Sequence, residues 1–359
     1  MDKVTQQRGF IRHLHAFRGF AIVNIVAVHA FASAITFVRP EDPPRFDAFL
    51  SLANEIAFHD STIYFALISG LLYSTVLAGR GWGKFYSGKL RNVLLPYVFF
   101  TLLLTLWVRP PVVGAEFGGL FASGAGEYFK TVGLNLVDGG AMFHLWYMPV
   151  LAVLFLATPL IAGSLGHKQA RWLVLLVVLA PLAVSRSGID VSVQSVVYFL
   201  GVYAVGIAVG RDYDRWLAWL ERNLLLLGAV AILASLLFPL LGRLGFQQVG
   251  FWNPVESLHY IHKLAIAGVA LVLLKRWEER IPRWLDLLAT YAFAIYFLHA
   301  VVIVLLEFAA NSYFTEHPSL VETLAMCALW LTLAIGVSVA ITWVVRRIFG
   351  KRSRMIVGA

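Results

Sequence analysis

Two ionisable residues of one apolar segment, Arg18 and His29, have the right types and spacing to do chemistry together. If the segment is helical, their separation of eleven residues returns them to within about 20° of one face, roughly 16 Å apart. A guanidinium holds phosphate groups through forked hydrogen bonds, and an imidazole accepts a proton near neutral pH. The pair therefore fits a donor with an anionic head and a reactive group on a long arm. The alternative is an arginine at a helix end and a packed histidine, with no shared function.

Further polar residues interrupt other apolar segments, at a cost of about 2.5–3.5 kcal/mol for each charge at a helix centre. Ser69 and His299 fall at the depth of His29 in their segments. Four others fall nearer the far end of theirs: Asp60, His144, Glu256 and His259. This distribution predicts a polar cavity that extends from the middle of the apolar layer toward the far side.

One of these segments carries Glu256, His259, His262 and Lys263 close together. A glutamate followed three residues later by a histidine can bind a metal, but di-iron bundles need this motif on two helices. The sequence has no second copy, so we expect no metal. We expect hydrogen-bonding or sugar-contacting groups here instead.

The composition shows which kind of element must position these residues. Hydrophobic residues make up 60% of the 359 positions and charged residues only 14%, whereas soluble domains have about 25% charged residues. A membrane-spanning helix needs about 20 apolar residues. The sequence predicts an all-α, polytopic integral membrane protein of about ten transmembrane helices. The expected spans are 16–38, 57–79, 93–108, 142–165, 170–185, 192–210, 223–241, 255–274, 287–309 and 322–348.

The positive charges between these spans predict the orientation, because Lys and Arg collect on the cytoplasmic side. With the N-terminus inside, 21 of them fall on the cytoplasmic side and 6 on the other. The net charge of +9 is therefore an orientation signal, and we exclude nucleic acid as a partner. We expect a cytoplasmic basic N-terminus at 1–15, a transmembrane domain at 16–348 and a cytoplasmic basic tail at 349–359. The longest connection, 109–141, is glycine-rich and predicted to form a lid or entry loop on the outer side.

The N-terminal region resembles a signal peptide, with Ala32-Ser33-Ala34 in the position of a cleavage site. Arg18 and Asn24 interrupt its apolar stretch, which also continues past Ala34, so we expect it to be retained as a helix. The single cysteine, Cys327, excludes a disulfide within the chain.

Five fragments, in order along nearly the whole chain, give the sequence a family resemblance. They are Phe17-Arg18-Gly19-Phe20 followed by His29, Phe65-Ala66-Leu67-Ile68-Ser69-Gly70, Lys89 and Arg91 before Leu94-Leu95-Pro96-Tyr97, His144-Leu145-Trp146-Tyr147-Met148, and Ile295-Tyr296-Phe297-Leu298-His299. In this order the chain resembles the acyltransferase 3 family of membrane-bound acyltransferases. It departs from the family pattern at Lys89, where a second arginine is common, and at Ala66, where a second aromatic residue is common.

The resemblance implies ten transmembrane helices in the plasma membrane, a cytoplasmic acyl-CoA donor, most simply acetyl-CoA, and a glycan or lipid-linked sugar as acceptor on the opposite face. The residues would then divide into three groups. Arg18, Lys89 and Arg91 would bind the donor phosphates; His29 would act on the acceptor hydroxyl, with His299 and Ser69 in support; and His144, Glu256, His259 and Asp60 would contact the sugar. For His29, general base catalysis and an acyl-histidine intermediate both remain open.

A transporter or flippase for a lipid-linked glycan is the rival hypothesis, because charges within the membrane also mark transport pathways. Such proteins often consist of two inverted halves with broken helices in matching places, and the sequence has no such internal symmetry. A purely structural membrane subunit would leave Arg18 and His29 without a role. The sequence does not identify the sugar, the acyl chain or the oligomeric state.

Overall fold

A computed structural model describes residues 10–37, 45–107, 124–186, 188, 190–245, 252–310 and 319–359. Every regular element in these ranges is helical, and they contain no strand. The α-helices are α1 (Arg12–Phe37), α2 (Arg45–Phe58), α3 (Thr62–Leu72), α4 (Trp82–Lys89), α5 (Leu95–Trp107), α7 (Ala125–Asp138), α8 (Tyr147–Gly166), α9 (Arg171–Leu179), α10 (Val193–Arg211), α11 (Tyr213–Arg222), α12 (Leu224–Arg243), α13 (Pro254–Arg276), α14 (Arg283–Thr290), α15 (Ala292–Ala310), α16 (Leu320–Phe349) and α17 (Ser353–Ile356).

Nine helical stretches of the described chain are long and apolar enough to cross a membrane. They confirm the predicted all-α, polytopic architecture. Three are clearly longer than expected: Ala48–Arg80 begins earlier with α2, Trp82–Leu106 begins earlier with α4, and Leu320–Ile356 continues past the end of α16. The first two contain the π-helical turns Tyr73–Leu77 and Leu90–Leu94. The connection expected at 109–141 lies partly outside the described residues, which exclude 108–123. In the described part of this connection, α7 is the main element.

The expected span 170–185 differs from the other nine because its α-helix, α9, has only 9 residues. The chain nevertheless covers the length of α8 in this region. At one end the side chain of Arg171 donates to the carbonyl of Leu165 near the end of α8. At the other end the guanidinium of Arg186 lies 5.3 Å from the ring centre of Trp146, just before α8 begins. Short helix, 3₁₀ turns and extended chain together therefore return across the bundle.

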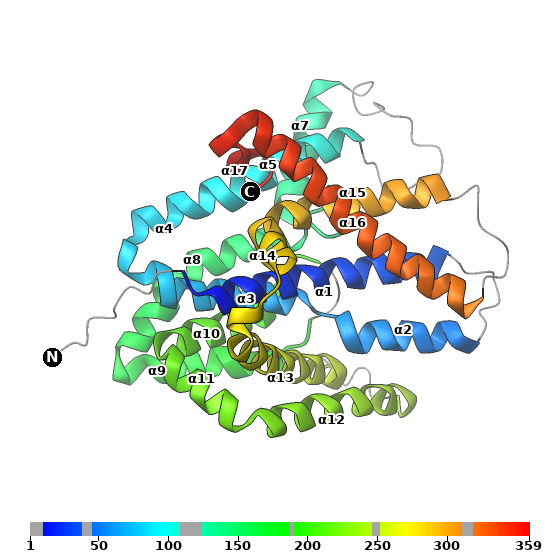
Figure 1. Cartoon of the computed structure of the whole chain (residues 1–359). Helices are drawn as coiled ribbons and strands as arrows, with labels where there is room; N and C mark the ends of the chain where they lie inside the picture. Colours follow the sequence, from blue (N-terminus) through cyan, green and yellow to red (C-terminus); the bar gives the residue numbers. More distant parts are fainter. Residues whose placement is uncertain are drawn as a thin grey trace.

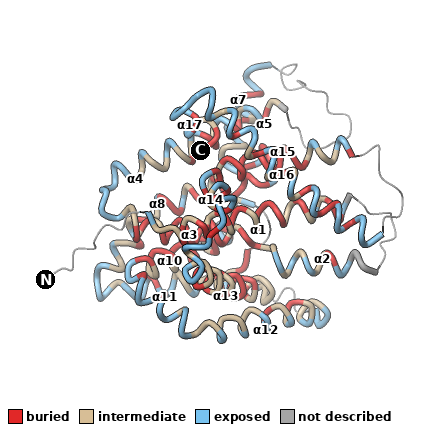
Figure 2. The backbone as a smooth tube through the Cα atoms, viewed as in Figure 1, coloured by how far each residue is buried: buried red, intermediate tan, exposed pale blue. Residues whose placement is uncertain are grey.

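Helix α1 runs through the middle of the bundle (Figure 1) and packs against α2, α3, α13, α14, α15 and α16. Helices α1, α3, α10, α13 and α15 each contribute many buried residues (Figure 2). The backbones of α3 and α10 meet at Gly70 and Gly206, where a Cβ on either glycine would collide with a carbonyl of the opposite helix. Such contacts between small residues are a common way for membrane helices to associate.

The span Ala48–Arg80 breaks between α2 and α3, at His59–Ser61. Asp60 at this break has a φ of 56°, a left-handed conformation that aspartate tolerates better than most residues. The break frees carbonyl groups at the end of α2, and the buried ammonium of Lys263 donates to two of them, those of Ile56 (3.1 Å) and Ala57 (2.9 Å). Asp60 was expected near the outer end of a span at 57–79. It lies farther from the end of the span than expected, because the span begins at Ala48. Its carboxylate is at the level of Tyr198, near the start of α10.

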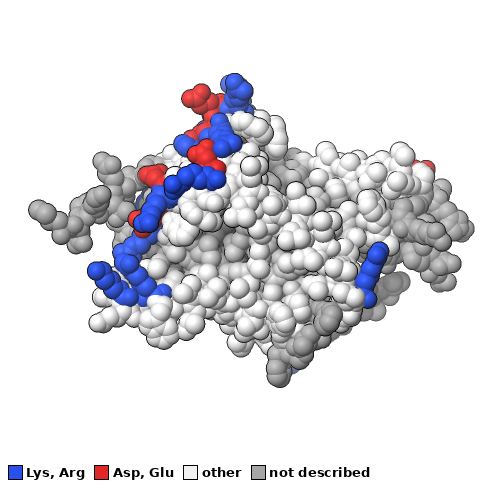
Figure 3. Space-filling model, turned by 90° about the horizontal axis from the view of Figure 1, so that it is seen from below, with Lys and Arg blue, Asp and Glu red and all other residues white. Residues whose placement is uncertain are grey.

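Charged side chains on the visible face gather mainly at one end of the bundle (Figure 3). We call this the basic end; it is where α1 begins and where α10, α13 and α16 finish. Arg12 pairs there with Asp286 and Arg276 with Glu221, while the ring of His13 bonds to Glu278. The contacts of Arg12 and His13 attach the start of α1 to the chain that follows α13, and that of Arg276 attaches the end of α13 to α11.

Candidate active site

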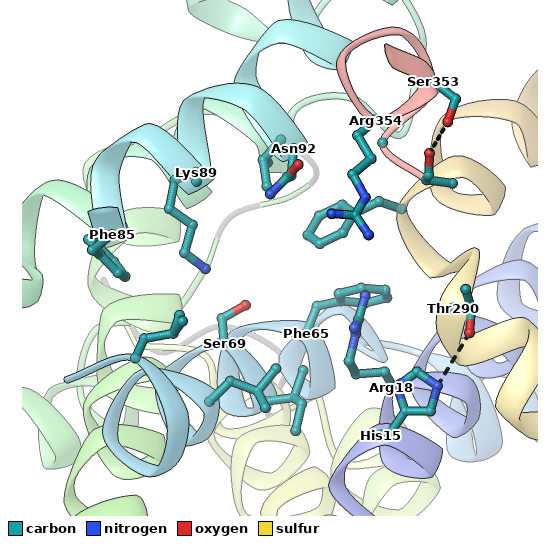
Figure 4. A pocket seen from close by; sticks show the side chains of 18 of the residues that line it. His15, Arg18, Phe65, Ser69, Phe85, Lys89, Asn92, Thr290, Ser353 and Arg354 are labelled. Atoms are coloured by element: carbon teal, nitrogen blue, oxygen red, sulfur yellow. Dashed lines mark hydrogen bonds between the residues drawn. The ribbon is translucent and has the colours of Figure 1, made fainter. Parts of the chain in front are cut away.

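A cavity of about 870 Å³ opens at the basic end of the bundle (Figure 4). Its volume is near the upper end of the range of about 300–1,000 Å³ for small-molecule sites. Seven of its described lining residues are Lys or Arg, and none is Asp or Glu. The seven are Arg18, Arg80, Lys84, Lys89, Arg346, Lys351 and Arg354. A cavity of this size and charge fits a large ligand with several negative charges.

Arg18 points into this cavity from α1. No hydrogen bond or ion pair joins its guanidinium to another residue of the described chain, whereas Arg12, Arg186 and Arg276 each have a carboxylate partner. The neighbouring Gly19 allows α14 to come close, because a Cβ there would lie 2.6 Å from the carbonyl oxygen of Leu285. A partly enclosed guanidinium without a carboxylate partner is ready to bind an anionic ligand.

Lys89 points into the cavity opposite Arg18, at the end of α4. Its ammonium lies 4.2 Å from the ring centre of Phe155 and 5.4 Å from that of Phe85, which fixes the stem without neutralising the charge. Ser69 also lines this cavity, so it lies with the predicted donor-binding residues and not with His29. Arg91 is exposed on the following π-helical turn and does not line the cavity.

Three histidines from three segments gather farther along the bundle. The ring centre of His299 on α15 lies 5.5 Å from that of His29 on α1 and 4.9 Å from that of His144, just before α8. His144 and His299 are buried, whereas His29 is partly exposed. His144 was grouped with the sugar-contacting residues from its position in the sequence; the fold places it in this histidine cluster. His29 is therefore the accessible member of the cluster.

The contacts of His299 determine its tautomer. Its Nδ1 lies 3.0 Å from the carbonyl of Ile295 and 2.7 Å from that of Tyr296, and carbonyl oxygens only accept. Nδ1 therefore carries the hydrogen, which leaves a lone pair on Nε2 when the ring is neutral. This Nε2 and both ring nitrogens of His144 are buried without a hydrogen-bond partner in the described chain. Because buried polar atoms normally have partners, these nitrogens are available for hydrogen bonds to a ligand or to water beside the rings.

Aromatic rings lie between the basic cavity and the histidine cluster. Phe65 and Phe293 line the cavity with their ring centres 5.8 Å apart, and Phe65 also contacts Tyr296 at 6.2 Å. Tyr296 in turn contacts the ring of His144 and donates its hydroxyl to the carbonyl of His144. His29 does not line the cavity. Arg18 and His29 thus belong to one helix but lie on opposite sides of this aromatic layer.

A third cluster, at the helix break, brings together three of the residues predicted to contact a sugar. Asp60 pairs with Arg186 at 2.5 Å and accepts a 2.7 Å hydrogen bond from Tyr198. His59 lies 3.4 Å from the carboxylate of Glu256. His259 lies 3.6 Å from Glu55, whose side chain is 46% exposed, and stacks on Phe238. The cap of Asn253 and the proline after it begin α13 here and so position Glu256.

One oxygen or nitrogen from each of His59, Asp60 and Glu256 lies within 4.8 Å of the others, so these three are the residues that could hold a metal. However, Arg186 already neutralises Asp60. The cluster therefore fits hydrogen bonding to a polar ligand at least as well as it fits a cation.

Several of these residues were not found from the sequence. His59 is next to Asp60 and could have been noticed for that reason. Arg186, Tyr198 and Glu55 gave no local signal, because only the fold brings them to Asp60 and His259. Five of the cavity's cations had been counted only as orientation signals: Arg80, Lys84, Arg346, Lys351 and Arg354.

Comparison with protein families gives one match, to a model described as an acyltransferase domain, the Acyl_transf_3 model, over residues 11–347. The match covers nearly the whole chain and includes the basic cavity's residues up to Arg346, the histidine cluster and the helix break. No curated protein and no solved structure matches the chain.

Proposed function

Because the chain belongs to the acyltransferase 3 family, we propose that it transfers an acyl group, most simply acetyl, from cytoplasmic acyl-CoA to a hydroxyl of a cell-surface or lipid-linked glycan. The enzyme would lie in the plasma membrane with its basic end in the cytoplasm, as the positive-inside rule requires. Residues 1–15 and 349–359 would then be cytoplasmic and 16–348 the transmembrane domain. The observation that carries the proposal is the large cavity whose described lining has seven Lys and Arg side chains and no Asp or Glu; one of the seven, Arg18, is on the same helix as His29.

The donor binds in the basic cavity. Arg18 and Lys89 hold its phosphate groups from opposite sides, and Ser69 adds a hydroxyl beside them. Arg91, exposed nearby, contributes to the attraction of the anion toward the opening. The thioester arm extends toward His29 past Phe65 and Phe293, which lie between the cavity and the histidine cluster.

The acyl group is transferred beside the histidine cluster. His29 takes the proton of the acceptor hydroxyl while the hydroxyl oxygen attacks the thioester carbonyl carbon. The carbon–sulfur bond then breaks, and the sulfur leaves with the proton from His29. In the competing sequence the imidazole nitrogen attacks first, and the hydroxyl then takes the acyl group from it. His299 and His144 offer ring nitrogens that lack partners in the described chain and can orient His29 or the acceptor.

The acceptor approaches from the opposite face, where the helix-break cluster lies. Glu256, His59 and Glu55 are partly exposed and can bind sugar hydroxyls. His259 is enclosed and acts through Glu55, 3.6 Å away. Asp60 acts mainly through Arg186 and Tyr198, because its carboxylate is fully enclosed.

The test uses purified protein, radiolabelled acetyl-CoA and a crude surface-glycan extract. The wild type should label the glycan, and His29→Ala should lower the rate by about 10²–10⁴-fold if His29 is the general base. His167→Ala, at an exposed histidine after α8, serves as the control and should keep full activity. Labelled glycan at an undiminished rate with His29→Ala would remove His29 from the reaction. No label from the wild type, combined with movement of a lipid-linked glycan across vesicles, would favour the flippase.

A further inference from the structure

The chain from the last turn of α16 onward forms one wall of the basic cavity. Seven of the 23 described lining residues come from the segment 346–359, which we call the C-terminal hook. The seven are Arg346, Gly350, Lys351, Ser353, Arg354, Gly358 and Ala359. The hook supplies three of the cavity's seven Lys and Arg residues, as many as α1 and α4 together.

Contacts with the rest of the fold hold the hook in place. Ser353 is 1% exposed, and its hydroxyl lies 2.7 Å from the carbonyl of Gly350 and 2.5 Å from that of Ala359. Val357 is buried in the main core. A Cβ on Gly358 would lie 3.1 Å from Phe293 and 3.3 Å from the carbonyl of Asn92. The hook is therefore a packed part of the bundle, and its side chains have defined positions.

Arg354 extends from this wall into the cavity and faces Arg18 across it (Figure 4). The two guanidinium groups come from opposite ends of the described sequence, and neither has a hydrogen bond or ion pair within the described part of the chain. Nearby, Arg346 lies 5.2 Å from the ring centre of Tyr291, a contact that fixes its stem and leaves its charge available. Because like charges repel, placing these cations around one cavity costs free energy that a bound anionic ligand can offset.

We propose that the C-terminal hook is a donor-binding element, in which Arg354 binds one phosphate group of the acyl donor while Arg18 and Lys89 bind another. This inference rests on the proposed function and extends it. Arg18 and Arg354 enter the cavity from different walls, so a donor that carries phosphate at two places, as a nucleotide-containing thioester does, can engage both at once. A donor with a single phosphate, such as an acyl phosphate, would engage only one side of the cavity.

The test is calorimetric titration of the full-length protein in detergent with CoA. Arg354→Gln should weaken CoA binding by about 10- to 100-fold, the effect expected for loss of a hydrogen bond to a charged group. Arg352→Gln is the matched control, because Arg352 is exposed in the same segment but does not line the cavity. Both variants should unfold at the wild-type temperature. In Arg18→Gln/Arg354→Gln the two losses should multiply, because the groups act at separate sites.

Equal dissociation constants for Arg354→Gln and Arg352→Gln, with a weakened Arg18→Gln, would overturn the role of the hook and leave the proposed function intact. A wild-type protein that does not bind CoA would instead overturn the proposed donor, and this inference with it.

Discussion

Asp60 and Arg186 form the most enclosed ion pair in the described chain, with side chains 0% and 5% exposed and 2.5 Å between charged atoms. Removing one partner of such a pair leaves a buried charge uncompensated, at a cost of about 3–5 kcal/mol. Tyr198 still donates to Asp60 after Arg186→Met, but this hydrogen bond is already present in the wild type and does not replace the charge of the guanidinium. We therefore expect Arg186→Met to lower the free energy of unfolding by about 3–4 kcal/mol.

The double variant Asp60→Asn/Arg186→Met isolates the charge. Asparagine keeps the left-handed backbone of residue 60, which a larger apolar residue would strain, and can still accept from Tyr198. With no carboxylate left to neutralise, the double variant should recover at least half of the loss caused by Arg186→Met.

Chemical denaturation in detergent micelles, followed by tryptophan fluorescence, would measure the four free energies of this cycle. If the two single losses simply added in the double variant, the pair would contribute nothing through its charge. The buried ion pair would then not explain why the span breaks at Asp60. If the double variant is stable but its apparent KM for the glycan rises, Asp60 and Arg186 also help to shape the acceptor site.

Two further predictions concern packing and pH. Gly70→Leu should greatly reduce the yield of folded protein, because it forces α3 away from α10. Gly228→Ala should leave the yield unchanged, because nothing lies within 4 Å of a Cβ at this position. Equal yields of the two variants by size-exclusion chromatography would contradict the close approach of α3 and α10. Burial raises the pKa of Glu278, but hydrogen bonds from Lys275 and His13 lower it by more, so that the pKa is about 2. Because this pKa is depressed in the folded state, the stabilisation by Glu278 is present above about pH 4.5 and is lost as the pH falls toward 2. Over this range the free energy of unfolding of the wild type should fall by about 1–3 kcal/mol more than that of Glu278→Gln. Parallel curves of unfolding free energy against pH would contradict the contact.

The spans were predictable because apolar length is a physical requirement of each crossing, and each span must satisfy it locally. The helix α9 shows the limit of this requirement. Its α-helical part is too short to span, yet the chain covers the length of α8 by adding 3₁₀ turns and extended residues as far as Arg186. Arg186 itself is buried against Asp60, but the sequence around Arg186 gives no sign of this contact. The break at Asp60 was missed for the same reason, since Lys263, which satisfies the freed carbonyls, is some two hundred residues away.

The site was predictable where one helix determines the geometry and unpredictable where several helices do. Arg18 and His29 share α1, so their spacing alone placed them on one face. The aromatic layer between them is formed by Phe65 of α3 and by Phe293 and Tyr296 of α15, and it could not be predicted from α1. Ser69 and His299 were predicted at one depth, and the fold sends Ser69 to the basic cavity and His299 to His29.

The charges of the C-terminal hook show that one residue can satisfy two physical requirements at once. Arg346, Lys351 and Arg354 contribute to the positive charge of the basic end, and the same three residues line the cavity. An orientation signal requires only that a cation lie on one side of the membrane, so it leaves the direction of the side chain undetermined. A binding site requires that direction to be fixed, and the burial of Ser353 and Val357 fixes it. Counting charges therefore identifies the end of the bundle that attracts an anion, whereas the packing of the hook determines which of those charges can bind it.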